Sequence, residues 1–226
     1  MKPNFEVRSG QNPAVFKKTL KKEIMVNYLI HLPENYKKDG QSFPMLVFLH
    51  GAGERGNDIE KVKAWGPPKI AENDKSFPYV LVSPQCPEGD WWSNPSQLEN
   101  LYVLITAVME NYNVDKSKVY LTGLSMGGYG TWALAIQHPE LFAAIAPICG
   151  GGQPRMTRNL VDIPTWVFHG AKDTVVPINE SENMVNALKK FGGNVKFTVF
   201  PEATHNSWTQ AYNETDLLTW FLKYQK

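Results

Sequence analysis

Short apolar runs recur along this chain of 226 residues, and each is about as long as one buried strand. Gly or Pro bounds the runs, and segments of helical composition or periodicity separate them. Continuous apolar strands that alternate with helices are typical of a parallel sheet covered on both faces. The predicted strands are 45–49, 79–82, 119–122, 143–148, 165–168 and 195–200. The predicted helices are 96–111, 126–137, 180–191 and 214–223.

Two earlier segments, 5–8 and 24–32, alternate loosely and predict antiparallel strands. No internal repeat or linker divides the sequence, so we expect one α/β domain over residues 1–226, with helices on both faces of a mostly parallel sheet. Open sheets of this kind bind their ligands beyond the carboxyl ends of the strands. The loops that follow the apolar runs are therefore where the chemistry is expected.

Charge and composition give little reason to expect a macromolecular partner. The chain has 23 Lys and Arg against 22 Asp and Glu, a formal net charge of +1, which favours neither nucleic acid nor a membrane surface. No apolar stretch approaches the roughly 20 residues of a membrane helix, and the first ten residues lack a signal-peptide core. We expect a cytoplasmic protein by default, or a secreted one if a signal has been removed. Cys86 and Cys149 fit no metal motif; two buried free thiols are favoured, and their pairing stays open.

The stretch 119–128 places Gly-Leu-Ser-Met-Gly between a predicted strand and a predicted helix. This is G-x-S-x-G in the setting that a nucleophile elbow requires. The sharp turn brings the positions two before and two after the serine together, so Gly123 and Gly127 are expected because side chains there would collide. The turn also exposes the serine Oγ at a helix start, where free N–H groups favour developing negative charge. Ser125 is therefore the predicted nucleophile.

A serine hydroxyl needs a general base, and histidine suits this role because its pKa lies near operating pH. His205 follows the last predicted strand, where a loop can reach over the sheet edge to the nucleophile. His31 lies within an early strand, and His138 ends the helix after the elbow. His50 and His169 each end a strand before a glycine and are expected to shape loops. His205 is the predicted base.

The histidine in turn needs a carboxylate to fix its tautomer. Asp173 lies five residues beyond the predicted strand 165–168 and so belongs at the same sheet edge. Asp162 precedes that strand, and Asp216 opens the last predicted helix, where stabilising the helix start is the simpler role. Asp173 is the predicted third member of a catalytic triad.

The segments LHGAGERG, GLSMGG, HGAKDTVVP and THNSW, in this order, resemble the α/β-hydrolases. Within that superfamily the chain is similar to compact carboxylesterases, dienelactone-hydrolase-like proteins and "predicted peptidase" esterases of the phospholipase/carboxylesterase type. The resemblance covers nearly the whole chain and is far more specific for fold and triad than for substrate. It implies a serine carboxylesterase without metal or cofactor, acting on a small-molecule ester.

Residues 51–56 match G-x-G-x-x-G, which also occurs in dinucleotide-binding loops. A Rossmann site needs an acidic residue that typically ends the next strand, but strand 79–82 is followed by Ser-Pro-Gln. In α/β-hydrolases this loop instead donates a backbone N–H to the oxyanion, beside the N–H of the residue after the nucleophile. That assigns Met126 as one donor, and the resemblance points to Ala52 as the second, with Gly53 as the alternative.

Three tryptophans are candidates for the substrate site. Trp91 and Trp92 follow strand 79–82, and Trp208 lies three residues past His205. Core filling is the competing interpretation for each of them. If they line the cleft, they suit a flat acyl group or a sugar-bearing ester, such as feruloyl or acetyl esters of plant carbohydrate.

The segment 150–162 is too short for a helical cap, so the site is expected to be open. Two rival functions remain: a serine peptidase acting on small peptides, and a non-catalytic binding module on a hydrolase fold. No propeller or gating domain accompanies the catalytic unit, which favours esters over peptides. An intact set of Ser, Asp and His argues against the binding module. The sequence does not indicate the oligomeric state.

Overall fold

The computed structural model describes residues 11, 15–19 and 21–226, and its centre is a seven-stranded sheet in the order β1-β3-β2-β4-β5-β6-β7. The strands are β1 Tyr28–His31, β2 Phe43–Leu49, β3 Val80–Pro84, β4 Val114–Leu124, β5 Ala144–Ile148, β6 Thr165–Gly170 and β7 Val195–Phe200. β1 pairs antiparallel with β3, and every other neighbouring pair is parallel. The predicted α/β fold with a mostly parallel sheet is confirmed, while the strand predicted at 5–8 lies outside the described residues.

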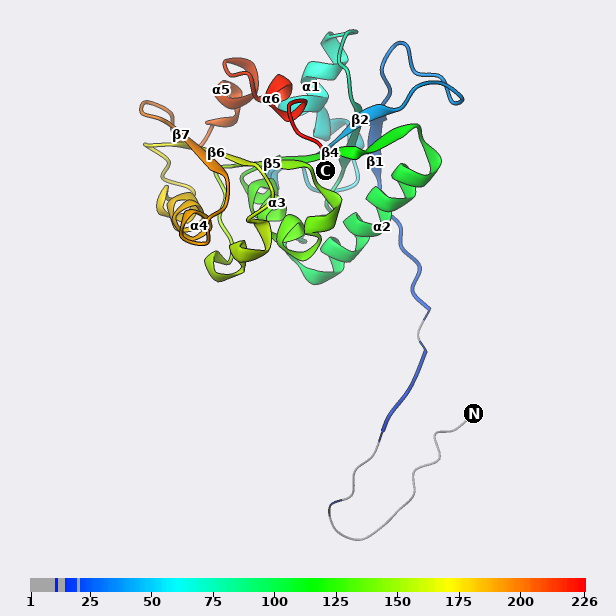
Figure 1. The fold of residues 1–226 in the computed structure, drawn as a ribbon, viewed down its shortest axis with the longest axis horizontal. Helices are drawn as coiled ribbons and strands as arrows, with labels where there is room; N and C mark the ends of the chain where they lie inside the picture. Colours follow the sequence, from blue (N-terminus) through cyan, green and yellow to red (C-terminus); the bar gives the residue numbers. More distant parts are fainter. Residues whose placement is uncertain (1–10, 12–14, 20) are drawn as a thin grey trace.

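Helices cover both faces of this sheet. The α-helices are α1 Gly66–Asn73, α2 Pro95–Asn111, α3 Met126–Gln137, α4 Asn179–Lys190, α5 Trp208–Asn213 and α6 Leu217–Phe221. The 3₁₀ helices are η1 Ala52–Glu54, η2 Ile59–Ala64, η3 Pro139–Leu141 and η4 Pro154–Leu160. Figure 1 shows α1, α5 and α6 on one side of the sheet and α2, α3 and α4 on the other.

The two layers of helices explain why β2 is apolar without a break. Successive side chains of a strand point to opposite faces. Met45, Val47 and Leu49 belong to one buried cluster, and Leu46 and Phe48 belong to the other. All five are fully buried, and each such side chain contributes about 1.5–3 kcal/mol by leaving water.

Several boundaries differ from the sequence prediction. The helix predicted at 214–223 is only α6, because α5 ends at Asn213 and a turn separates the two. Helices α1 and α5 were not predicted, since they are short and the second and third residues of α1 are prolines, which the first turn of a helix tolerates. β1 is shorter than the predicted segment 24–32, and β4 begins before residue 119.

The connection between β5 and β6 contains only η4 and loop residues. The fold therefore carries no large cap there, as the sequence predicts. Cys86 and Cys149 are both buried free thiols. Among the residues that the structure describes, no helix combines the length and the apolar character needed to cross a membrane.

Candidate active site

Ser125 lies on the turn between the end of β4 and the start of α3. Its φ of 52° and ψ of −115° are strained for a residue with a side chain. A Cβ on Gly127 would lie 1.9 Å from the Leu49 carbonyl oxygen, and one on Gly123 would lie 2.4 Å from the carbonyl oxygen of Gly127. Both glycines are thus required for the close passage of backbone, as the elbow motif predicts. The Ser125 N–H donates to the Ile148 carbonyl at 3.0 Å and holds the turn against β5.

The three predicted triad residues meet at the carboxyl edge of the sheet. His205 Nε2 lies 2.9 Å from Ser125 Oγ, and His205 Nδ1 lies 2.8 Å from Asp173 Oδ2. Ser125 follows β4, Asp173 follows β6 and His205 follows β7. Parallel strands bring these segments together although they are far apart along the chain.

The Asp173 side chain is fully buried, yet the residue is suited to carry charge. Burial raises its pKa, but the hydrogen bond from His205 and the N–H groups of Val176 and Val175 outweigh burial and hold the pKa below its usual value. Those two N–H groups each donate to Asp173 Oδ1 at 2.9 Å. A charged Asp173 keeps the proton of His205 on Nδ1 and leaves Nε2 free to accept one.

A second buried imidazole contacts the same carboxylate. His169 Nε2 lies 2.9 Å from the Val176 carbonyl oxygen and 3.3 Å from Asp173 Oδ2. Its Nδ1 lies 2.8 Å from the hydroxyl of Ser181, which donates to the Gly150 carbonyl at 2.8 Å. His169 therefore shapes the loop that carries Asp173, which agrees with its predicted structural role.

The predicted oxyanion donors begin two helices beside the nucleophile. Met126 is the first residue of α3 and Ala52 is the first residue of η1, so neither backbone N–H has a partner inside its helix. Ala52 is half-buried, whereas Gly53 is exposed and a Cβ there would meet nothing within 4 Å. Arg55 Nε donates to the Ala52 carbonyl at 3.0 Å and fixes the shape of this loop.

His50 supports the same loop from beneath. Its Nδ1 donates to the Gly51 carbonyl at 2.6 Å, and its Nε2 accepts the Cys86 N–H at 3.0 Å. Burial lowers the pKa of His50 to about 4, so the imidazole is neutral near pH 7. Trp92 Nε1 donates to the His50 carbonyl at 3.0 Å, and the Trp92 side chain is completely buried. The prediction that Trp92 lines the substrate cleft therefore does not fit this structure: packing under the loop is its role here.

The other two candidate tryptophans lie nearer to solvent or to the triad. Trp91 is 44% exposed, and the guanidinium of Arg55 lies 5.4 Å from the centre of its ring. The Trp208 ring lies edge-on to His205 with 5.3 Å between ring centres. Sequence reasoning missed Trp65, whose ring lies 6.0 Å from that of Trp208. Its signal was weak, because it stands alone before a helix that was not predicted.

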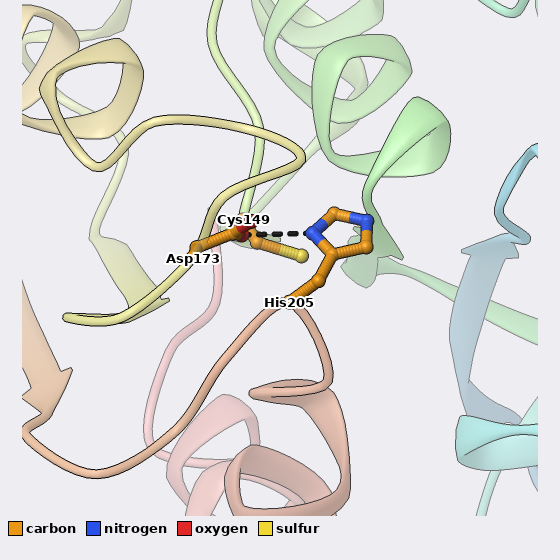
Figure 2. A group of neighbouring side chains, drawn as sticks. All are labelled: Cys149, Asp173 and His205. Atoms are coloured by element: carbon orange, nitrogen blue, oxygen red, sulfur yellow. Dashed lines mark hydrogen bonds and ion pairs between the residues drawn. The ribbon is translucent and has the colours of Figure 1, made fainter.

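Cys149 lies beside Asp173 and His205, as Figure 2 shows. One ligand atom from each of the three lies within 4.8 Å of the others, and all three residue types are found among zinc ligands. However, Asp173 and His205 are hydrogen-bonded to each other, and burial raises the pKa of the Cys149 thiol to about 12. This arrangement suits an acid–base pair flanked by a neutral thiol better than a metal centre.

The order Ser, Asp, His along the chain, on loops after β4, β6 and β7, is that of the α/β-hydrolases, and the chain is a protein of this class. Within it, the chain belongs to the dienelactone hydrolase family, whose model matches residues 89–217, more than half of the sequence.

Relatives and solved structures of this class include several esterases. A probable feruloyl esterase C from Aspergillus terreus is 26% identical over 74% of this chain. A bifunctional acetylxylan esterase/xylanase from Neocallimastix patriciarum is 27% identical over 69% of it. A solved structure described as a thermostable esterase is 34% identical, covers 89% of this chain and 60% of its own, and superposes with a TM-score of 0.77. The matched region spans 62% of the first relative and 22% of the second.

Proposed function

We propose that this protein is a serine carboxylesterase and that residues 1–226 form a single catalytic domain. The observation that carries the proposal is the continuous hydrogen-bonded path from Asp173 Oδ2 through both ring nitrogens of His205 to Ser125 Oγ. Such a path supplies a nucleophile, its general base and the group that orients the base. The esterases among the relatives and solved structures support ester rather than amide cleavage.

The reaction then proceeds in two halves. Ser125 Oγ attacks the ester carbonyl carbon while His205 Nε2 takes the hydroxyl proton, and the N–H groups of Met126 and Ala52 bind the oxyanion. His205 returns the proton to the leaving alcohol, and an acyl-enzyme on Ser125 remains. His205 next takes a proton from water, whose oxygen attacks the acyl carbon, and then returns that proton to Ser125 as the acid leaves. Asp173 stabilises the imidazolium in both halves.

The alcohol or acyl part of the substrate is proposed to carry an aryl or carbohydrate group. Trp208 contacts the ring of His205. Trp91 is an exposed indole beside Arg55 of the proposed oxyanion loop, and relatives include feruloyl and acetylxylan esterases. A panel of p-nitrophenyl acyl esters, methyl ferulate, acetylated xylan and peptide amides ranks the candidate substrates. Faster turnover of peptide amides than of every ester would favour the peptidase alternative.

The mechanism is tested with Ser125→Ala. We expect kcat/KM on p-nitrophenyl acetate to fall at least about a thousandfold, with an unchanged urea unfolding curve. Labelling by a fluorophosphonate should disappear in the same variant. Ser42→Ala is the matched control, because Ser42 is an exposed serine at the opposite edge of the sheet and should leave both readouts intact. Wild-type turnover by purified Ser125→Ala protein would contradict the proposal.

A further inference from the structure

A groove of about 350 Å³ lies between α1 and α5. Residues from Trp65 to Asp74 line one wall, and residues from Trp208 to Asn213 line the other. At 1.5 Å per residue, the eight residues of α1 span about 12 Å along the groove. The volume of the groove falls within the usual range of small-molecule sites.

One end of the groove adjoins the catalytic residues. Trp208 lines it and contacts the ring of His205 edge-on at 5.3 Å. On the other wall, the Trp65 side chain interacts with the carboxyl group of Glu54. Glu54 ends η1, the short helix that begins with Ala52. One tryptophan of the groove thus contacts the base, and the other contacts the loop of the proposed oxyanion donor.

The position of the groove corresponds to the alcohol side of a bound ester. In the proposed reaction, His205 Nε2 protonates the leaving alcohol, so the alcohol departs on the side of the imidazole. Trp208 is the groove residue that contacts this imidazole. Because the Trp65 and Trp208 rings touch each other, with 6.0 Å between ring centres, a group attached to the ester oxygen would extend over this pair of rings and into the groove beyond it.

The chemistry of the groove favours a neutral, polyhydroxylated ligand. The indoles of Trp65 and Trp208 meet at 67°, and the Lys69 ammonium lies 5.2 Å from the centre of the Trp65 ring. The ring surface left open to the groove can contact C–H groups. The Trp208 Nε1 is buried and has no hydrogen-bond partner among the described residues, so it can donate to a ligand oxygen once the indole shifts toward the groove. Exposed amides of Asn73 and Asn213 stand at the far end and can pair with hydroxyl groups.

Charge argues in the same direction. Lys69 and Asp74 both line the groove, and their opposite charges leave no net attraction for an ionic ligand. The Asp74 carboxylate also binds the backbone N–H and hydroxyl of Ser76. A bare aromatic acid would leave the polar end of the groove unused, whereas a sugar chain uses both its rings and its amides.

We propose that the α1–α5 groove is a subsite for the carbohydrate alcohol of the ester substrate. This inference rests on the proposed esterase function and specifies its leaving group as an oligosaccharide. Trp65 and Trp208 contact the sugar ring next to the scissile ester, and Asn73 and Asn213 contact the ring beyond it.

Calorimetric titration of Ser125→Ala protein with xylotriose and with cellotriose tests the subsite directly. We expect at least one sugar to bind, and we expect Trp65→Ala and Asn213→Ala, each in the Ser125→Ala background, to weaken that binding about tenfold. Phe191→Ala is the matched control: it removes an exposed aromatic ring outside the groove and should leave the affinity unchanged. Trp65→Phe should retain part of the affinity, which separates loss of ring contact from a folding defect.

Failure of both sugars to bind, or binding that Trp65→Ala and Asn213→Ala leave intact, overturns the subsite. Affinity that is lost in Trp91→Ala but not in Trp65→Ala would assign the sugar to the other exposed aromatic surface and also overturns it. Because these sugars contain no ester and the protein lacks the nucleophile, the result is independent of catalysis. An inactive enzyme that binds sugar in the groove would refute only the esterase, and an active esterase without sugar binding would refute only the subsite.

Discussion

Two imidazoles contact the carboxylate of Asp173, and only that of His205 reaches the nucleophile. The other, His169, is completely buried and links the Val176 carbonyl to the hydroxyl of Ser181. Val176 also donates its N–H to Asp173 Oδ1. His169 therefore acts through the loop as a positioning residue, because it fixes the backbone that orients the carboxylate.

Replacing His169 tests this coupling. We expect His169→Phe to lower kcat about tenfold, the size of one lost net hydrogen bond, with little change in KM. His169→Gln keeps a donor for the Val176 carbonyl and should recover part of kcat.

The control for His169 is His138→Gln, an exchange at the end of α3. Its side chain contacts Glu140 and Tyr102 and not the triad, so kcat and KM should stay those of the wild type. A His169→Phe enzyme that folds and keeps the wild-type kcat would show that the second imidazole has no positioning role.

At the scale of elements, the end of β6 limits where the loop of His205 can run. β6 ends at Gly170, and the loop after β7 passes directly over it. A Cβ on Gly170 would lie 2.2 Å from the Thr204 carbonyl oxygen and 2.5 Å from that of Ala203. Both neighbours are backbone atoms that immediately precede His205 in the chain, so they can yield only if the loop moves.

Gly170→Ala should therefore displace the base. We expect a loss of about 1–3 kcal/mol in the free energy of unfolding from overpacking, and a fall in kcat larger than that of a variant equally destabilised elsewhere. Gly152→Ala is the comparison, because its nearest neighbour would be the flexible end of Met184. Urea unfolding and kcat on p-nitrophenyl acetate measure both effects. Equal kcat values for the two variants would show that the loop adapts without moving His205.

The elements that sequence could predict are those with strong local patterns. Apolar runs located six strands, and G-x-S-x-G located the turn between β4 and α3. Ser125, Asp173 and His205 could be placed together because each follows a strand whose carboxyl end faces the same edge. Helices α1 and α5 were missed because they are short, and they are held by tertiary packing rather than by strong local signals. The groove that they form was missed with them.

The sequence also could not predict which of two adjacent tryptophans is buried. Adjacent tryptophans at 91 and 92 look alike in composition, yet one is 44% exposed and the other is 0% exposed. The difference arises from the loop after β3, which turns Trp92 under His50. Only the packed structure tells which side of that loop faces the core.

At the scale of the whole molecule, the ends of the neighbouring strands β2 and β3 are joined by one neutral imidazole. His50 follows β2, and its Nε2 accepts the N–H of Cys86, which follows β3. Protonation would place an N–H against that N–H and would also leave a charge in a fully buried position. The folded protein therefore resists protonation of His50, and its pKa falls to about 4.

This lowered pKa makes stability depend on pH. Unfolded histidine titrates near pH 6.5, so between that pH and about 4 the unfolded chain binds a proton that the folded chain excludes. Stability from His50 is therefore complete above the unfolded pKa and is lost as the pH falls toward 4, by at most about 3 kcal/mol. His31, whose pKa burial also lowers, changes stability in the same direction.

Urea unfolding of the wild type and of His50→Gln at neutral and at mildly acidic pH isolates the contribution of His50. The glutamine does not titrate, so the variant should be less stable than the wild type near neutrality and should lose less stability on acidification. The contribution of His31 is common to both proteins and cancels in the difference. The same imidazole also binds the carbonyl of Gly51, the residue before Ala52. Acid should therefore disturb the proposed oxyanion loop before the protein unfolds. Parallel pH curves for the two proteins would show that His50 titrates normally and that acid sensitivity arises elsewhere.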